Sequence, residues 1–190
     1  VPGLGVNAIA KEAGVGKPLI YRYFGGMSEL MSEFGHDADF WFGQEDVVAE
    51  AERMTDGDMP KDFGSLIRLV VLCYARILRQ RPVLQEVLVS ELITQNVAVK
   101  PLAQARREAA KAAIAEFVGD AQPPDGVDAE AVTAILVGAF QYMILRSRIF
   151  DDFLGVPIET DEEWKRCEDT MTLIIDRVLG DGPSLASQGL

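Results

Sequence analysis

The chain has 190 residues, of which 48% are hydrophobic, and its formal net charge is −12. This content supports a sizeable core and excludes a disordered chain, and the length suits one large domain or a small domain joined to a medium one. We find no apolar run of about 18 residues, so we expect neither a membrane-spanning segment nor a membrane partner.

The charge is uneven along the chain. Residues 1–24 carry Lys11, Lys17 and Arg22 against Glu12 alone, a net +2, so the other 166 residues carry −14. An acidic body repels nucleic acid, so contact with phosphate groups is restricted to the N-terminal end. The alternative is that an excess of two charges over so short a segment is chance.

Helical patterns run through nearly the whole chain, and they predict an all-α fold. The first two are short, at residues 6–13 and 17–23, with Gly14 between them and Gly25-Gly26 after them. Ile9, Ala10 and Ala13 share one side of the first helix. A longer helix is predicted from Ser28 to about Thr55, with bends where glycines interrupt it.

The remaining helices are predicted from apolar spacing, capping residues and prolines. They cover residues 62–80, 82–93, 101–118, 128–150 and 161–179, the last opened by a capping box, Thr160-x-x-Glu163. The loop before it contains Gly155 and Pro157, and residues 181–190 are predicted to be a flexible tail. Cys73 and Cys167 fall in different helices and are typical of small buried side chains in a reducing cytoplasm; a disulfide between them is the alternative.

The first two patterns together describe a helix-turn-helix. Gly14 permits the sharp turn, and Val15 is expected to fill it from inside. Ile20 and Phe24 are four residues apart, so they are expected to share the inward face of the second helix. The rest of that helix, with its basic and aromatic side chains, is left for the groove and the flanks of DNA.

The string IAKEAGVGKPLIYRYF, followed by Ser28-Glu29-Leu30, resembles the DNA-binding signature of the TetR family of transcriptional repressors. The resemblance is close over residues 5–30 and is only architectural beyond them. It implies a helix-turn-helix domain at residues 1–30, a larger helical ligand-binding and dimerisation domain at 31–180, and the tail. Family members carry a further helix before the motif, and residues 1–4 are too short for it. We therefore expect that the true N-terminus is missing or that the DNA-binding domain is incomplete.

The sequence departs from the family pattern at four positions. Gly5 and Gly16 stand where the family places Ser or Thr to cap the two helices, and each glycine costs about a few tenths of a kcal/mol of stability. Met27 stands where a lysine often reaches a phosphate, and losing that contact weakens binding without changing base preference. Leu19 replaces a common threonine and can touch a thymine methyl group.

Family roles carried over by position give seven DNA-binding candidates. Lys17, Pro18 and Leu19, preceded by Gly16, resemble the groove-facing start of the recognition helix. Tyr21 resembles a phosphate or groove contact, Tyr23 a phosphate contact, and Arg22 a phosphate partner. The alternative for both tyrosines is packing in the core of the small domain.

Two recognition helices spaced by one turn of DNA read a palindrome, so a homodimer on a double-stranded operator is expected. The family pairs the last two helices of each chain into a four-helix bundle. Interface candidates here are Val132, Ile135, Leu136, Ala139, Met143, Trp164, Met171, Ile174 and Ile175. The alternative is that both stripes face only their own core.

The resemblance also implies a small-molecule effector, bound among the middle helices. Candidate lining residues are Cys73, Tyr74, Phe117, Phe140, Tyr142, Met143 and Arg146; for each, ordinary core or surface packing is the alternative. The effector would act by shifting the population toward a state whose recognition helices no longer match the groove spacing.

The sequence favours no catalytic site, metal site or cofactor. His36 is the sole histidine of the chain, and no cysteine–histidine cluster has metal-ligand spacing. The chain is therefore interpreted as a cytoplasmic, ligand-responsive regulator and not as an enzyme. The rival reading is a helical ligand-binding or protein-interaction module that has lost DNA binding.

Overall fold

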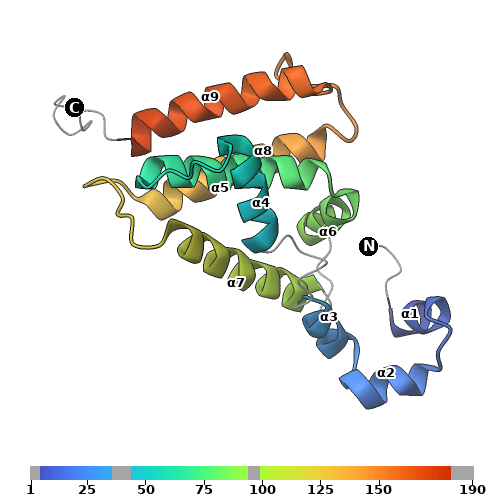
Figure 1. Ribbon diagram of the computed structural model, residues 1–190. Coiled ribbons are helices and arrows are strands. Elements are labelled where there is room, and N and C mark those ends of the chain that lie inside the picture. Colours follow the sequence, from blue (N-terminus) through green and yellow to red (C-terminus); the bar gives the residue numbers. More distant parts are fainter. Residues whose placement is uncertain (1–4, 36–43, 94–98, 181–190) are drawn as a thin grey trace. The chain divides into compact units, whose positions relative to one another are not determined.

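The computed structural model describes residues 5–35, 44–93 and 99–180 (Figure 1). The fold is all-α, as predicted, apart from one short hairpin. The helices are α1 (Val6–Glu12), α2 (Lys17–Phe24), α3 (Met27–Gly35), α4 (Gln44–Thr55), α5 (Phe63–Arg79), α6 (Pro82–Ile93), α7 (Val99–Val118), α8 (Ala129–Arg146) and α9 (Asp161–Leu179). The hairpin strands are β1 (Asp152–Phe153) and β2 (Val156–Pro157).

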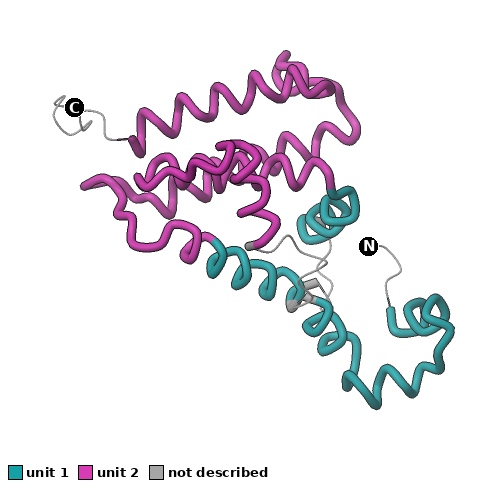
Figure 2. Tube along the Cα trace, viewed as in Figure 1, with its two compact units in different colours: residues 1–43, 81–113 teal, residues 44–80, 114–190 magenta. Residues whose placement is uncertain are grey.

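The chain divides into two compact units (Figure 2). Unit 1 comprises residues 1–43 and 81–113, and unit 2 comprises residues 44–80 and 114–190. Residues 81–113 thus group with the N-terminal residues, although they lie beyond the predicted boundary at residue 30. The division by function, into a DNA-binding segment, a ligand-binding body and a tail, stays a prediction.

In unit 1, α1 packs against α2, and α2 against α3. The buried side chains of these helices are Ala10, Ile20 and Met31. Gly14 has a φ of 66°, the left-handed conformation that the sharp turn between α1 and α2 requires. The predicted helix-turn-helix is therefore present, and its small residues allow the short helices to approach closely.

Three side chains of this motif lie differently from the prediction. Val15 and Phe24 are partly exposed, at 42% and 37%, and Ala13 is exposed as well. The backbone closes the turn instead, because the Val15 N–H donates to the Ala10 carbonyl at 2.9 Å. The side chain of Val15 is thus not needed inside the turn, and that part of the prediction was wrong.

The other helices of unit 1 are α6 and the first part of α7. Pro82 begins α6, as predicted, whereas α7 begins two residues before the predicted Pro101, which falls in its first turn. Arg106 of α7 donates to Glu91 of α6, with Nη2 2.5 Å from Oε2.

In unit 2, α5 is the central helix, and α4, α8 and α9 all pack against it. Its sequence is apolar on most sides, and residues such as Val71, Cys73 and Leu78 are completely buried. Asp62 caps its N-terminus, because Oδ1 accepts from the Ser65 N–H at 2.8 Å. These hydrogen bonds lower the pKa of the Asp62 carboxyl, since the charged form is the better acceptor.

Three arginines of α5 pair with acidic residues of α9, which runs antiparallel to it. The pairs are Arg68–Asp176 at 2.8 Å, Arg76–Glu168 at 2.6 Å and Arg79–Asp161 at 2.6 Å. The two helices approach closely at one end, where a Cβ added to Gly64 would lie 2.5 Å from the Leu179 carbonyl oxygen. The capping box of α9 is confirmed: Thr160 Oγ1 accepts from the Glu163 N–H, and Glu163 accepts from the Thr160 N–H.

A two-stranded antiparallel hairpin replaces part of the loop expected before α9. Phe153 pairs with Val156 and Asp152 with Pro157, so the turn consists of Leu154 and Gly155. Both turn residues have positive φ, at 53° and 75°. This is the combination that a tight two-residue hairpin turn requires.

Helix α8 is apolar on all sides. Its length and hydropathy are those of a membrane span, although we expected no such run; among the described residues it alone passes this test. Thr133, Leu136, Phe140 and Ile144 are nevertheless buried on the side that packs against α5. A membrane-spanning role would require α8 to leave this core.

Two predictions fall wholly or partly on residues outside the described ones. These are the tail at 181–190 and the continuity of the long helix predicted from Ser28 to Thr55. The described parts of that helix are α3 and α4.

Candidate nucleic-acid interface

The turn between α1 and α2 determines where α2 begins. Gly5 and Gly16 are the N-cap residues of the two helices, in extended conformations and without a side-chain capping bond, as the sequence predicts. Pro18 lies in the first turn of α2, where its missing N–H leaves no hydrogen bond unmade. Ile20, which is 4% exposed, is the buried side chain of α2.

The remaining side chains of α2 lie on its outer surface. The rings of Tyr21 and Tyr23 are 48% and 70% exposed, so neither packs in a core. Lys17 and Arg22 are exposed, and Leu19 is half-buried. The basic and aromatic side chains of α2 are therefore exposed, and they are spread over more than one side of the helix.

Each basic group of α2 lies beside a tyrosine. Lys17 Nζ is 5.8 Å from the centroid of the Tyr21 ring, and Arg22 Cζ is 4.9 Å from that of Tyr23. Arg22 Nη2 also donates to the Tyr23 hydroxyl oxygen at 3.1 Å. The guanidinium retains other N–H donors and the phenol its own proton, so the pair can donate to two oxygens of one phosphate.

The comparison with protein families gives one match. Residues 2–34 match the family described as "Bacterial regulatory proteins, tetR family". The match covers the helix-turn-helix, α1 to α3, and supports a DNA-binding regulator similar to this family. No curated protein and no solved structure matches the chain.

All seven predicted DNA-binding residues lie inside the segment matched to the tetR family. The segment has three basic residues, Lys11, Lys17 and Arg22, and three acidic ones, Glu12, Glu29 and Glu33, so its net charge is zero. A neutral domain gains little from long-range attraction to DNA. If this segment binds DNA, its affinity must come mainly from direct contacts, for which the exposed side chains of α2 are the predicted source.

The predicted effector residues do not all surround one space. Cys73 and Phe140 are fully buried core residues, and burial raises the pKa of the Cys73 thiol to about 12. The Tyr74 hydroxyl donates to Gln141 Oε1 at 2.7 Å, which ties α5 to α8. Phe117 and Met143 are half-buried.

The other two effector candidates belong to a cluster with the hairpin. Arg146 Cζ lies 4.2 Å from the Phe150 ring centroid and 5.6 Å from that of Phe153. Tyr142 meets Phe153 edge to face, with centroids 5.2 Å apart. Their partners are thus hairpin side chains, and their role toward an effector stays a prediction.

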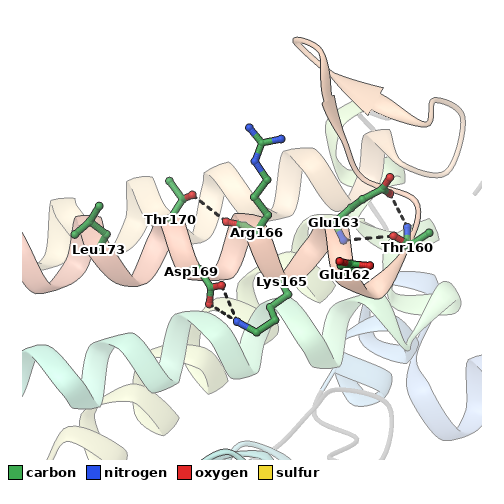
Figure 3. Close-up of a pocket in the computed structure, with 8 residues that line it drawn as sticks. All are labelled: Thr160, Glu162, Glu163, Lys165, Arg166, Asp169, Thr170 and Leu173. Carbon is green, nitrogen blue, oxygen red and sulfur yellow. Dashed lines mark hydrogen bonds and ion pairs between the residues drawn. The ribbon is translucent and has the colours of Figure 1, made fainter.

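A surface depression lies along the outer side of α9, between Thr160 and Leu173 (Figure 3). None of the seven effector candidates lines it. Lys165 Nζ is paired with both Asp169 oxygens, at 2.8 and 2.6 Å, and Arg166 extends away from the helix (Figure 3). The depression is open to solvent, and several of its polar groups, such as Lys165 and Asp169, are paired with each other.

The predicted dimer residues fall into two groups. Leu136, Trp164, Met171 and Ile175 are buried inside unit 2 and cannot reach a partner without disrupting its core. Ile135, Ala139 and Ile174 are exposed, and Val132 and Met143 are intermediate. Sequence reasoning treated α8 as one stripe, whereas its apolar residues form an inward and an outward face.

The sequence reasoning also missed the ion pairs between α5 and α9. Arg76 contacts Glu168 and lies 3.6 Å from Glu50 of α4, so the three helices meet at one cationic group. A detectable signal was present: α5 contains three arginines and no acidic residue, whereas α9 is rich in acidic residues. That complementarity predicts pairing between the two helices, although not its register.

Proposed function

We propose that the chain is a cytoplasmic transcriptional repressor that binds a palindromic operator as a homodimer and is released by a small-molecule effector. The proposal rests on one observation above all: α2 directs Lys17, Tyr21, Arg22 and Tyr23 outward from a helix-turn-helix of the tetR family. Regulators of this family act by binding DNA, and we propose no catalysis.

The outer face of α8 supports the homodimer. Ile135 and Tyr142 are 69% and 53% exposed, and the small residues Ala131, Ala134 and Gly138 lie exposed along the same side. Nothing lies within 4 Å of the place where a Gly138 Cβ would be, so no neighbour in the protomer explains a glycine there. A helix that is apolar on all sides is normally covered on all sides. A second copy would cover this face, and Gly138 would allow the two backbones to approach closely.

The homodimer gives the DNA-binding face its specificity. A single helix makes too few contacts to select a site, whereas two copies one helical turn apart, roughly 34–36 Å, read two half-sites. An effector can then release DNA only through its differential affinity for a state with another spacing. We place its site in unit 2, among the predicted residues of α5, α7 and α8.

Selection of operator sequences from random duplexes, followed by fluorescence anisotropy at 50–200 mM salt, tests DNA binding. We expect a palindromic consensus. We also expect the logarithm of the binding constant to fall linearly with the logarithm of the salt concentration. In Arg22→Ala the slope of this line should be shallower by about 2, because two protomers each lose one phosphate contact worth about 0.9. Lys111→Ala is the matched control, since Lys111 is an exposed basic residue of α7 outside the matched segment. An unchanged slope in Arg22→Ala would show that Arg22 does not contact a phosphate.

The alternative function is a helical ligand-binding or protein-interaction module without DNA binding. The zero net charge of residues 2–34 and the missing capping side chains at Gly5 and Gly16 favour it. This alternative is supported if the full chain selects no sequence or does not bind duplex DNA at 50 mM salt.

A further inference from the structure

The segment between α8 and α9 carries three exposed large apolar side chains, two of which are the most exposed among the described residues of unit 2. Leu154 is 87% exposed, Ile149 is 79% exposed, and Phe150 is 50% exposed. The base of the hairpin is nevertheless fixed, because Ile158 is buried and its N–H donates to the Asp151 carbonyl at 2.9 Å. The exposed side chains are therefore held on an ordered frame.

A cationic and aromatic cluster fastens the hairpin to the end of α8. The Arg146 guanidinium lies over Phe150 and beside Phe153, and its Nε donates to the Asp152 carbonyl at 3.3 Å. Tyr142 contacts the edge of Phe153. Side chains that are positioned before binding lose less conformational entropy when a partner covers them.

Leu154 is an unusual residue for its place. It occupies a hairpin turn with a φ of 53°, where Gly, Asn or Asp are favoured and a leucine is strained. It also points into solvent, so packing within the protomer does not stabilise it there. Neither the turn nor the protomer core explains this leucine, whereas contact with another molecule would.

The occupant is indicated by continuity with α8. Tyr142 is part of the outer face of α8 and also contacts the hairpin through Phe153, so the two apolar surfaces join. A stable dimer buries about 800 Å² on each protomer. The α8 face consists largely of alanine and glycine and supplies little of this area, whereas the hairpin adds large side chains.

We infer that the hairpin, with Ile149 and Phe150, clasps the second copy of the chain and forms the outer part of the dimer interface. The inference rests on the proposed homodimer. A lipid surface is the less suitable occupant, because Asp151 and Asp152 are exposed beside the patch and the chain carries −12 overall, which opposes anionic membranes. By two-fold symmetry each protomer contributes one hairpin, so a single substitution changes two contacts in the dimer.

Sedimentation equilibrium of three variants tests the inference. Leu154→Asn removes the apolar contact but places in the turn a residue that favours positive φ, so the protomer is expected to stay folded. We expect the dimer dissociation constant to rise at least tenfold. Ile149→Ser, which leaves the turn unchanged, is expected to raise it as well. Leu92→Asn is the control, since Leu92 is a comparably exposed leucine, at 74%, on α6.

Ile135→Lys separates this inference from the homodimer on which it rests. If the wild-type chain is a dimer that Ile135→Lys dissociates, while Leu154→Asn and Ile149→Ser stay within twofold of wild type, the clasp is refuted and the dimer stands. If the wild-type chain is monomeric at every concentration, both fail. Wild-type binding to phosphatidylcholine–phosphatidylglycerol vesicles that Leu154→Asn abolishes, without a change in dimerisation, would also overturn the clasp.

Discussion

The ion pairs around Arg76 make the sharpest prediction about the body of the protein. Arg76 Nε lies 3.1 Å from both carboxylate oxygens of Glu168, Nη2 lies 2.6 Å from one of them, and Nη1 lies 3.6 Å from Glu50. Both carboxylate side chains are only 9% exposed. The hydrogen bonds that Arg76 donates to Glu168 raise the pKa of Arg76, so the guanidinium stays charged. Replacing Arg76 by methionine leaves the buried Glu168 carboxylate without this cation, whereas Glu50 keeps its ion pair with Arg53 at 2.7 Å.

The expected loss of folding free energy depends on which charged groups each substitution leaves without a partner. Removing one partner of a buried pair costs about 3–5 kcal/mol, and the partial exposure of Arg76 places Arg76→Met near 3. Glu168→Gln is expected to cost about 1–2 kcal/mol, because its amide oxygen still accepts from Arg76 and Arg76 keeps Glu50. At about 2–4 °C per kcal/mol for a chain of this size, the midpoints fall by roughly 6–12 °C and 2–8 °C.

Thermal unfolding followed by circular dichroism measures both variants, at pH 7 and at one protein concentration, because the proposed dimerisation would shift the midpoint. The double variant Arg76→Met with Glu168→Met completes the cycle and is expected to recover much of the loss, since an apolar pair of similar volume replaces the ion pair. If Arg76→Met lowers the unfolding midpoint no more than Glu168→Gln, the reasoning that a buried carboxylate without its cation destabilises the fold is wrong.

Three further predictions concern capping, thiol burial and close helix packing. Asp62→Ala should lower the stability by about 1 kcal/mol at pH 7, and Asp62→Asn, which keeps the cap, by less. Since folding lowers the pKa of Asp62 below its usual 3.8, the contribution of its charge is complete above that value and is lost as pH falls through the folded pKa; urea titrations at pH 7 and pH 2.5 check this. Cys73, with its pKa near 12, should not react with a thiol reagent at pH 8, whereas the half-buried Cys167 should react slowly, so that a second thiol appears only in urea. Gly64→Ala should cost about 1–3 kcal/mol in urea unfolding, because its Cβ would meet the Leu179 carbonyl oxygen at 2.5 Å; an unchanged midpoint would show that α5 and α9 can separate freely.

The features that the sequence predicts well are local. The helix-turn-helix depends on Gly14 and on small residues within a few positions, and Asp62 and Thr160 cap the helices that directly follow them. Each of these requires only backbone geometry and neighbours within four residues. They are accordingly found where the pattern places them, to within one or two residues.

The features that the sequence does not predict depend on distant contacts. An amphipathic stripe reveals the inward side of a helix only when the other side is polar, and α8 has Ile135 and Tyr142 outside as well as Leu136 and Phe140 inside. The Arg68–Asp176 pair joins residues 108 positions apart, so no local pattern indicates it. The hairpin turn at Leu154 has no glycine or asparagine at its first position, and turn chemistry therefore gave no signal for it.

Charge links the proposed DNA binding to the proposed homodimer. The matched segment is neutral, so one protomer would have little attraction for DNA beyond the proposed contacts of Lys17, Arg22 and the two tyrosines. Each half-site is then weak by itself, and a second, tethered copy raises the effective concentration at the other half-site to the point where the pair binds usefully. A substitution on α8 or on the hairpin that separates the protomers should thus abolish operator binding although it touches no DNA-facing residue. In a strongly basic DNA-binding domain the same substitution would leave substantial non-specific affinity, because phosphate attraction alone would retain the monomer on DNA.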